Sequence, residues 1–171
     1  MCVLIIKNKG VKMPSEAILD ACAIANPHGF GFVSESDYFK SLSYDRFKAR
    51  LSAVGDDEAC MIHFRLATHG SIRRANCHPF KLGDLYFAHN GVLPITPDRD
   101  RTDSETAFRR YLAKPALVYG LHSEQLSKAV EGLIGASKFA FMQGADIVTF
   151  GKFVCLDGML YSNTRWQYYM R

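Results

Sequence analysis

The sequence has no long hydrophobic run, and this absence limits the kinds of protein it can encode. No apolar segment approaches the roughly 20 residues that a helix needs to cross a bilayer. The first residues also lack the basic segment, long apolar stretch and cleavage site of a secretory signal. We therefore expect a cytoplasmic protein that does not associate with membranes.

Cysteines are few, odd in number and scattered. No two of the five have the Cys-x-x-Cys spacing of a zinc or redox site. The pattern fits reduced, mostly buried thiols better than a disulfide framework. A Gly-rich phosphate-binding loop is absent as well. The five cysteines are Cys2, Cys22, Cys60, Cys77 and Cys155.

A strong excess of one charge is also missing. The chain carries 21 Lys and Arg against 17 Asp and Glu, with a net charge of +4 and a pI of about 8.8. The basic residues are dispersed, so the balance falls short of that of a dedicated nucleic-acid-binding protein. Two local exceptions, residues 73–74 and 99–101, are most simply solvated loops, although either is compatible with a place beside a polar substrate or partner.

What is present suits one globular domain. Hydrophobic residues make up 48% and charged residues 22% of the 171 positions, an ordinary balance for a chain long enough to bury a core. The sequence shows no internal repeat, low-complexity tract or linker. We expect residues 1–171 to form a single domain.

Capping residues and hydrophobic periodicity divide the chain into helices and strands. Ser15 and Ser123 stand where N-caps are expected, and Thr102 or Asp103 opens another helix. Predicted helices cover 16–25, 44–53, 102–112 and 123–134, and predicted strands cover 3–6, 29–33, 59–65, 85–88, 138–142, 147–150, 153–156 and 159–161. Because the last four strands are clustered apart from the helices, we expect an α+β fold with antiparallel sheets.

Cys2 directly follows Met1 and begins a strand-like apolar run. Methionine aminopeptidases remove Met1 when the next side chain is small, which would leave a cysteine with a free α-amine. Such an amine titrates at about pH 8, so it can accept the proton of the thiol in an N-terminal nucleophile. Many buried proteins also have a cysteine near the start, so Cys2 alone does not decide the function.

Four downstream segments carry polar residues at the ends of predicted strands or at the start of a helix. Residues 63–70 read His-Phe-Arg-Leu-Ala-Thr-His-Gly, and residues 76–80 read Asn-Cys-His-Pro-Phe. Residues 87–91, Phe-Ala-His-Asn-Gly, close a strand. Residues 102–105, Thr-Asp-Ser-Glu, open a helix.

Together with Cys2, these segments resemble the glutaminase domain of class II glutamine amidotransferases, which are N-terminal nucleophile (Ntn) hydrolases. The motifs are most similar to those of the glutaminase half of glucosamine-6-phosphate synthases, in the same order. Each motif is weak alone, but five in order over positions 2–105 are specific. The resemblance implies a four-layer αββα sandwich of two antiparallel sheets covered by helices. It implies no cofactor and no metal in the glutaminase step.

The resemblance also implies roles for individual residues. The Cys2 thiol attacks the side-chain amide carbon of L-glutamine, and the Cys2 amine shuttles the proton. The Asn90 side chain and the Gly91 backbone N–H form the oxyanion hole. Arg65 pairs with the substrate α-carboxylate, and Asp103 pairs with its α-ammonium.

Three further residues acquire a place by the same resemblance. Thr68 and His69 lie in the family's glutamine-binding loop, and His78 lies near the pocket. The planar fork of an Arg matches a carboxylate in two-point contact. An acidic residue opposite that Arg selects a free zwitterionic amino acid, since a blocked group would leave a charge unpaired.

Several of these residues also have a purely structural interpretation. Arg65 by itself is most simply a residue that bridges surface carboxylates. Asn90-Gly91 by itself is most simply a type I′ turn, and Asp103 is compatible with a helix cap alone or with both a cap and a ligand.

The histidines and a nearby cysteine also permit a different kind of site. Four histidines suggest a metal cluster, which the resemblance argues against. Cys77, beside one of them, is a conceivable second nucleophile, but a buried spectator thiol fits better. The four histidines are His63, His69, His78 and His89.

The chain departs from the family's pattern at three places. Leu66 stands where an aromatic residue is common, residues 26–31 replace the early loop, and the interval 91–103 is short and rich in Pro and charge. Nothing follows the glutaminase segment before Arg171. We therefore expect the ammonia acceptor to be a separate synthetase or amidotransferase subunit.

The sequence thus predicts an enzyme that hydrolyses L-glutamine to glutamate and ammonia through a Cys2 γ-glutamyl thioester. A second hypothesis is an amidase of the same nucleophile class that cleaves γ-glutamyl or other acyl amides. A third is a non-catalytic regulatory module that retains the amino-acid pocket. An unprocessed Met1 would block the nucleophile, and the sequence does not decide whether Met1 is removed.

Overall fold

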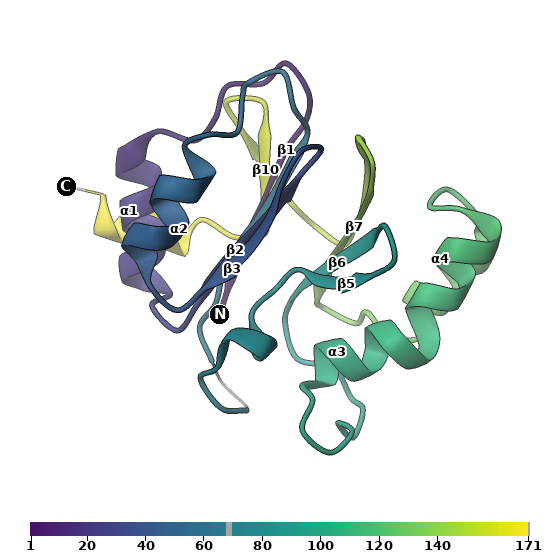
Figure 1. Cartoon of the computed structure of the whole chain (residues 1–171). Coiled ribbons are helices and arrows are strands. Elements are labelled where there is room, and N and C mark those ends of the chain that lie inside the picture. Colours follow the sequence, from purple (N-terminus) through teal and green to yellow (C-terminus); the bar gives the residue numbers. More distant parts are fainter. Residues whose placement is uncertain (68–69, 171) are drawn as a thin grey trace.

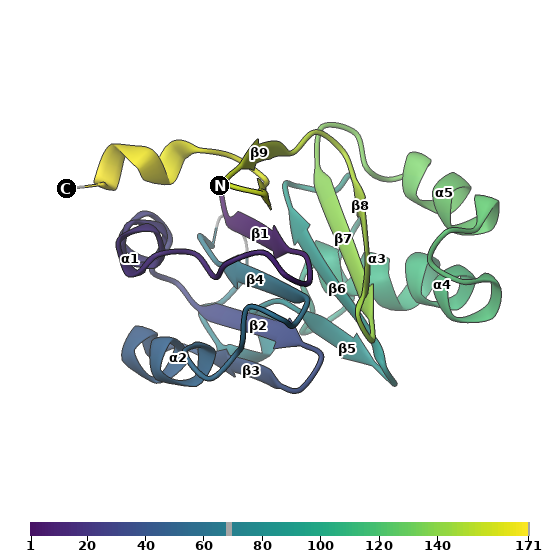
Figure 2. The same ribbon diagram turned by 90° about the horizontal axis from the view of Figure 1, so that it is seen from above.

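The computed structural model describes residues 1–67 and 70–170 and arranges them in four layers. Helices, a six-stranded sheet, a four-stranded sheet and further helices follow one another across the molecule (Figure 1). The view from above shows the same order, with α1 and α2 outside one sheet and α3, α4 and α5 outside the other (Figure 2). The predicted α+β sandwich of two antiparallel sheets covered by helices is confirmed.

The six-stranded sheet takes strands from both the first and the last part of the sequence and is antiparallel throughout. Its strands, in spatial order, are β3 (Tyr38–Ser41), β2 (Phe30–Ser34), β4 (Cys60–Phe64), β1 (Val3–Lys7), β10 (Met159–Tyr161) and β9 (Val154–Leu156). The helices that cover it are α1 (Glu16–Ala25), α2 (Tyr44–Leu51) and the 3-10 helix η3 (Arg165–Tyr169). As predicted, the hydroxyl of Ser15 caps α1, by accepting from the N–H of Ile18.

The four-stranded sheet is also antiparallel and comes from the middle of the chain. Its strands, in spatial order, are β5 (Phe80–Leu82), β6 (Leu85–Asn90), β7 (Lys138–Gln143) and β8 (Asp146–Phe150). The helices that cover it are α3 (Asp103–Ala107), the π-helix η2 (Phe108–Leu112), α4 (Ala113–Tyr119) and α5 (Glu124–Glu131). A short 3-10 helix, η1 (Arg74–Asn76), precedes β5.

Alternation of side chains along the strands builds three hydrophobic layers. In β1, Val3 and Ile5 pack with the helices on the outer face, whereas Leu4 and Ile6 pack between the sheets. In β6, Phe87 packs against the helices and Ala88 lies between the sheets. A strand that is buried on both faces has apolar residues at successive positions. This explains why residues 3–6 contain no polar residue.

Strand register brings the ends of several segments to one end of the sandwich. Val3 pairs with Phe64 in the antiparallel β1–β4 ladder, so Cys2 lies beside the residues that follow β4. In the facing sheet β6 ends at Asn90, and α3 begins at Asp103. In Figure 1 the N-terminus and α3 both lie in the lower half of the view.

The structure also extends the predictions. The helix predicted over 102–112 continues through η2 and α4 to Tyr119, past Pro115. Proline lacks an N–H and cannot donate to a carbonyl four residues earlier, and the preceding turn has π geometry. The short strands β3 and β5 were not predicted. In the described residues, no helix is both long and apolar enough to span a bilayer.

Phe87 provides a test of the core beneath α3. Its side chain is 0% exposed, and its ring stacks on Phe108 with 5.3 Å between centroids. Because Phe87→Ala leaves a cavity, we expect the free energy of unfolding in urea to fall by about 3–5 kcal/mol. The control Tyr168→Ala removes a side chain that is 89% exposed and should change this value by no more than about 0.5 kcal/mol. Equal losses in the two variants would contradict the assigned core.

Candidate active site

One pocket brings together five of the eight predicted site residues. Its lining includes Cys2, Arg65, His78, Gly91 and Asp103. In that order, they directly precede β1, directly follow β4, precede β5, directly follow β6 and begin α3. The predicted residues Thr68 and His69 lie outside the described part of the chain. The eighth residue, Asn90, directly precedes Gly91 and is buried.

The Cys2 thiol is held against the backbone that follows β4. Its Sγ accepts a hydrogen bond from the N–H of Leu66 at 3.3 Å and donates to the Leu66 carbonyl at 3.6 Å. Burial raises the pKa of Cys2, while the Leu66 N–H and the charges of the chain terminus and Arg65 oppose this shift. Because the thiolate is disfavoured, nucleophilic attack by Cys2 requires a nearby base.

Asn90 ends β6 with its side chain between the two sheets. Its Nδ2 donates to the hydroxyl of Ser162 at 2.7 Å, and the same hydroxyl accepts from the N–H of Leu4 at 2.9 Å. The buried Oδ1 of Asn90 has no hydrogen-bond partner among the described residues. The amide is therefore oriented by a residue of the C-terminal segment that sequence reasoning did not place in the site.

Gly91 occupies a backbone position that excludes other residues. Its φ is 149°, and a Cβ built there would lie 2.1 Å from the Ser137 Oγ. The interpretation of Asn90-Gly91 as a two-residue type I′ turn is wrong, because β6 does not continue into a hairpin there: its neighbours are β5 and the distant β7.

Arg65 and Asp103 place opposite charges in the pocket lining. Arg65 is only 4% exposed and donates from Nη1 to the Ser71 carbonyl at 3.1 Å, so it is not a surface residue. The Asp103 carboxylate accepts from the N–H of Leu93 and of Ser104 at 2.9 and 2.8 Å. Asp103 is the first residue of α3, and Thr102 is its N-cap.

Three buried histidines form a neutral wall beside these charges. Burial lowers the pKa of His63 to about 3 and that of His89 to about 4, and it holds the pKa of His78 well below its usual value. The rings of His63 and His78 lie 4.3 Å apart. No group of His, Cys, Asp or Glu in the described residues is arranged to hold a metal ion, and His69 is outside them.

Two other histidine contacts organise the site, and sequence reasoning assigned neither. The Nδ1 of His89 lies 2.7 Å from the Ser104 Oγ, which donates to Asp103 at 3.2 Å. The Nδ1 of His28 accepts from the N–H of Ala67 at 3.0 Å and so fixes the backbone beside the pocket. His89 stands in the His-Asn-Gly motif, whereas no local pattern marks His28.

Comparison with known families shows which family the chain belongs to. A family model described as class-II glutamine amidotransferases matches residues 56–151, more than half of the sequence. The chain belongs to the class-II glutamine amidotransferases. The matched residues contain Arg65, His78, Asn90 and Asp103, while Cys2 precedes them. The predicted family is confirmed.

A solved structure supports the same fold. The chain resembles glutamine phosphoribosylpyrophosphate amidotransferase from B. subtilis, complexed with ADP and GMP, with a TM-score of 0.60 and 17% identity. The likeness covers 94% of this chain and 41% of that protein, so the chain spans less than half its length. No curated protein matches the chain. Family and fold make this amidotransferase chain an Ntn-type enzyme.

The neutral histidines predict that acid destabilises the amidotransferase fold. The unfolded chain protonates them below about pH 6.5. The folded protein does not protonate His89 or His63 until about pH 4 and 3. Stability is therefore lost as pH falls from about 6.5 towards 4, by up to about 1.4 kcal/mol per pH unit for each histidine. Urea unfolding at pH 7, 6 and 5 measures this slope.

A variant tests whether His63 contributes to this pH dependence of stability. His63→Gln removes one titrating group and should make the loss of stability between pH 7 and pH 5 smaller. Tyr168→Ala changes an exposed side chain without a histidine and should leave the slope as it is. An unchanged slope in His63→Gln would show that His63 also takes up its proton in the folded protein.

Proposed function

We propose that this chain hydrolyses L-glutamine to glutamate and ammonia through a γ-glutamyl thioester on Cys2. The observation that carries the proposal is one pocket lined by a thiol, a Gly N–H at a strand end and two side chains of opposite charge. We further propose that residues 1–171 act as one glutaminase domain. Membership of the amidotransferase family supports glutamine as the substrate class.

The proposed reaction begins at the Cys2 thiol. Sγ adds to the γ-carbonyl carbon of glutamine, and its proton passes to the Cys2 α-amine, which is free once Met1 has been removed. The amine returns this proton to the departing nitrogen, so ammonia leaves and the thioester remains. Water, deprotonated by the same amine, then cleaves the thioester to glutamate and free thiol.

Asn90 and Gly91 serve as the proposed oxyanion donors. The Asn90 Nδ2 has two N–H donors, and the hydrogen bond to Ser162 uses one of them. The second N–H and the backbone N–H of Gly91 are then assigned to the oxygen of the tetrahedral intermediate. Donors fixed in advance in this way lower the barrier by roughly 3–4 kcal/mol each.

Arg65 and Asp103 are proposed to select free glutamine. The buried guanidinium of Arg65 binds the α-carboxylate, and the carboxylate of Asp103 binds the α-ammonium. Asp103 is already held by two backbone N–H groups, so little ordering is needed on binding. Thr68, His69 and His78 remain proposed neighbours of the substrate.

The ammonia is proposed to pass to a separate acceptor enzyme. The structurally similar B. subtilis protein is named as an amidotransferase that acts with phosphoribosylpyrophosphate, and this chain spans 41% of it. We also propose that the protein works in the cytoplasm.

The main test measures glutamate release from L-glutamine. The protein is first shown by intact mass to begin at Cys2. We expect Cys2→Ala to abolish release, because the nucleophile is lost, and Cys155→Ala to retain it, because Cys155 is an exposed thiol. Release by the Cys2→Ala variant would contradict the mechanism. Release from γ-glutamyl amides but not from glutamine would identify an amidase of the same nucleophile class.

Substrate selection gives a second test. Arg65→Lys keeps the charge but loses the planar fork, and Asp103→Asn loses the charge. We expect each change to lower kcat/KM for glutamine at least about tenfold, by removing roughly 1.5–3 kcal/mol of charged hydrogen bonding. Arg165→Lys, at an exposed position outside the pocket, is the control. Unchanged kcat/KM in both pocket variants would overturn the assigned contacts.

A further inference from the structure

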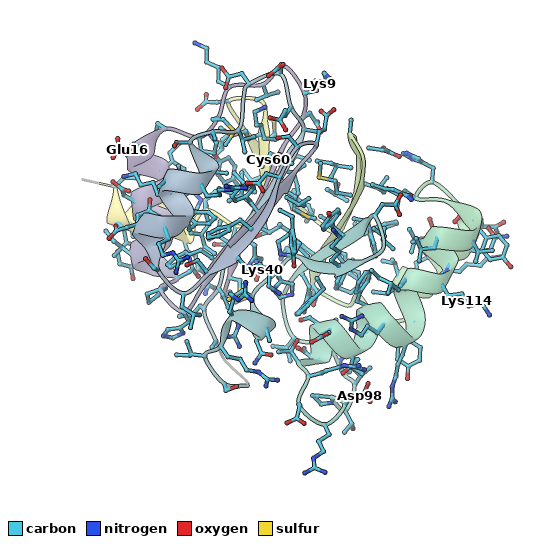
Figure 3. All side chains as sticks on the ribbon, in the orientation of Figure 1. Lys9, Glu16, Lys40, Cys60, Asp98 and Lys114 are labelled. Atoms are coloured by element: carbon cyan, nitrogen blue, oxygen red, sulfur yellow. The ribbon has the colours of Figure 1, made fainter. Side chains whose placement is uncertain are left out.

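A second groove lies beside the edge strand β3, outside the glutamine pocket. Its volume is about 430 Å³. The strand β3 and the start of α2 form one side, and Arg74 of η1 contributes the other. Figure 3 shows Lys40 pointing into the region between β3 and the short helical turn of η1. The lining residues are Phe39, Lys40, Ser41, Leu42, Ser43, Arg46 and Arg74.

Three cations line this groove, and no acidic side chain does. Within the described part of the chain, Lys40, Arg46 and Arg74 have no ion-pair partner. Asp45 is adjacent to Arg46 in sequence but does not line the groove. Like charges gathered around one hollow repel each other, and a bound anion would relieve that repulsion.

The Lys40 side chain is held in place by residues of η1 and β5. Its ammonium donates to the Ala75 carbonyl at 3.1 Å and lies 5.1 Å from the centre of the Phe80 ring. Burial lowers the pKa of Lys40 to about 8, against the opposing influence of Cys77 and Glu105. The carboxylate of Glu105 is itself paired with Arg109 at 2.8 Å.

Two hydroxyl groups add to the cationic side chains. The Ser41 Oγ accepts from the N–H of Ser43, and the Ser43 Oγ accepts from the N–H of Arg46. Neither O–H has an acceptor among the described residues, so each can donate to a ligand. The groove also lies at the N-terminus of the eight-residue helix α2, where the helix dipole favours an anion.

We propose that this groove binds the phosphoryl group of a small organic phosphate monoester. The guanidinium groups of Arg46 and Arg74 and the ammonium of Lys40 are charged donors that the oxygen atoms of a phosphate dianion accept from, and the two Ser hydroxyls are further donors in the same lining. The apolar side chains of Phe39 and Leu42 in the same lining contact the organic part. The site differs from the glutamine pocket: Asn76 of η1 lines that pocket, whereas Arg74 lines the groove.

The proposal is tested by calorimetric titration of the full chain with phenyl phosphate and with inorganic phosphate. We use the Cys2→Ala protein, so that the outcome does not depend on the proposed glutaminase. Phenyl phosphate should bind with one site per chain, and Arg46→Ala and Arg74→Ala should each weaken binding about tenfold. Added salt should weaken it further. The matched control is Arg165→Ala, an exposed position outside the groove, which should bind as the parent does.

Comparing the two ligands distinguishes an organic phosphate monoester from free phosphate. Tighter binding of phenyl phosphate supports an organic monoester as the ligand. Equal affinities, both reduced in the Arg46 and Arg74 variants, would overturn the monoester in favour of free phosphate. Absence of binding at millimolar concentrations, or binding unchanged in both variants, would overturn the site itself.

Discussion

The hydroxyl of Ser162 joins the two sheets at the point where the pocket is built. It accepts from the N–H of Leu4 in one sheet and from the Nδ2 of Asn90 in the other. Cys2 lies two residues before Leu4, and Gly91 directly follows Asn90, so these two hydrogen bonds link the Cys2 thiol to the proposed oxyanion donors. Because neither sheet alone contains both groups, the proposed chemistry depends on the packing of the sandwich.

Burial determines which ionisable side chains near Ser162 carry a charge. Three histidines are kept neutral by desolvation, so they line the interior without adding positive charge beside Arg65. The same burial raises the pKa of Cys2, which leaves proton removal to a separate base. A free α-amine on the cysteine itself would supply this base, in keeping with the proposed nucleophile at the start of a buried strand. The predicted acid sensitivity of the fold and the proposed need for N-terminal processing thus have one physical cause, the burial of ionisable groups.

Much of the fold was predictable from local patterns, but the site was predictable only in part. Buried strands such as β1 and β4 are continuous apolar runs, and the caps of α1 and α5 have clear signals. The short edge strands β3 and β5 mix polar and aromatic residues and have no such pattern. Motifs located Cys2, Arg65 and Asp103, whereas Ser162 contacts a residue 72 positions away. No local signal predicts a contact of that separation.

The central claim is that Cys2, freed of Met1, is a nucleophile set in a glutamine pocket. Intact-mass and peptide analysis after treatment with a glutamine analogue that carries an electrophile in place of the amide tests it most directly. The account predicts one adduct per chain, on Cys2 alone, slowed by excess L-glutamine and absent from protein that retains Met1. Modification of the exposed Cys155 instead, or labelling of Cys2 that glutamine does not slow, would contradict it.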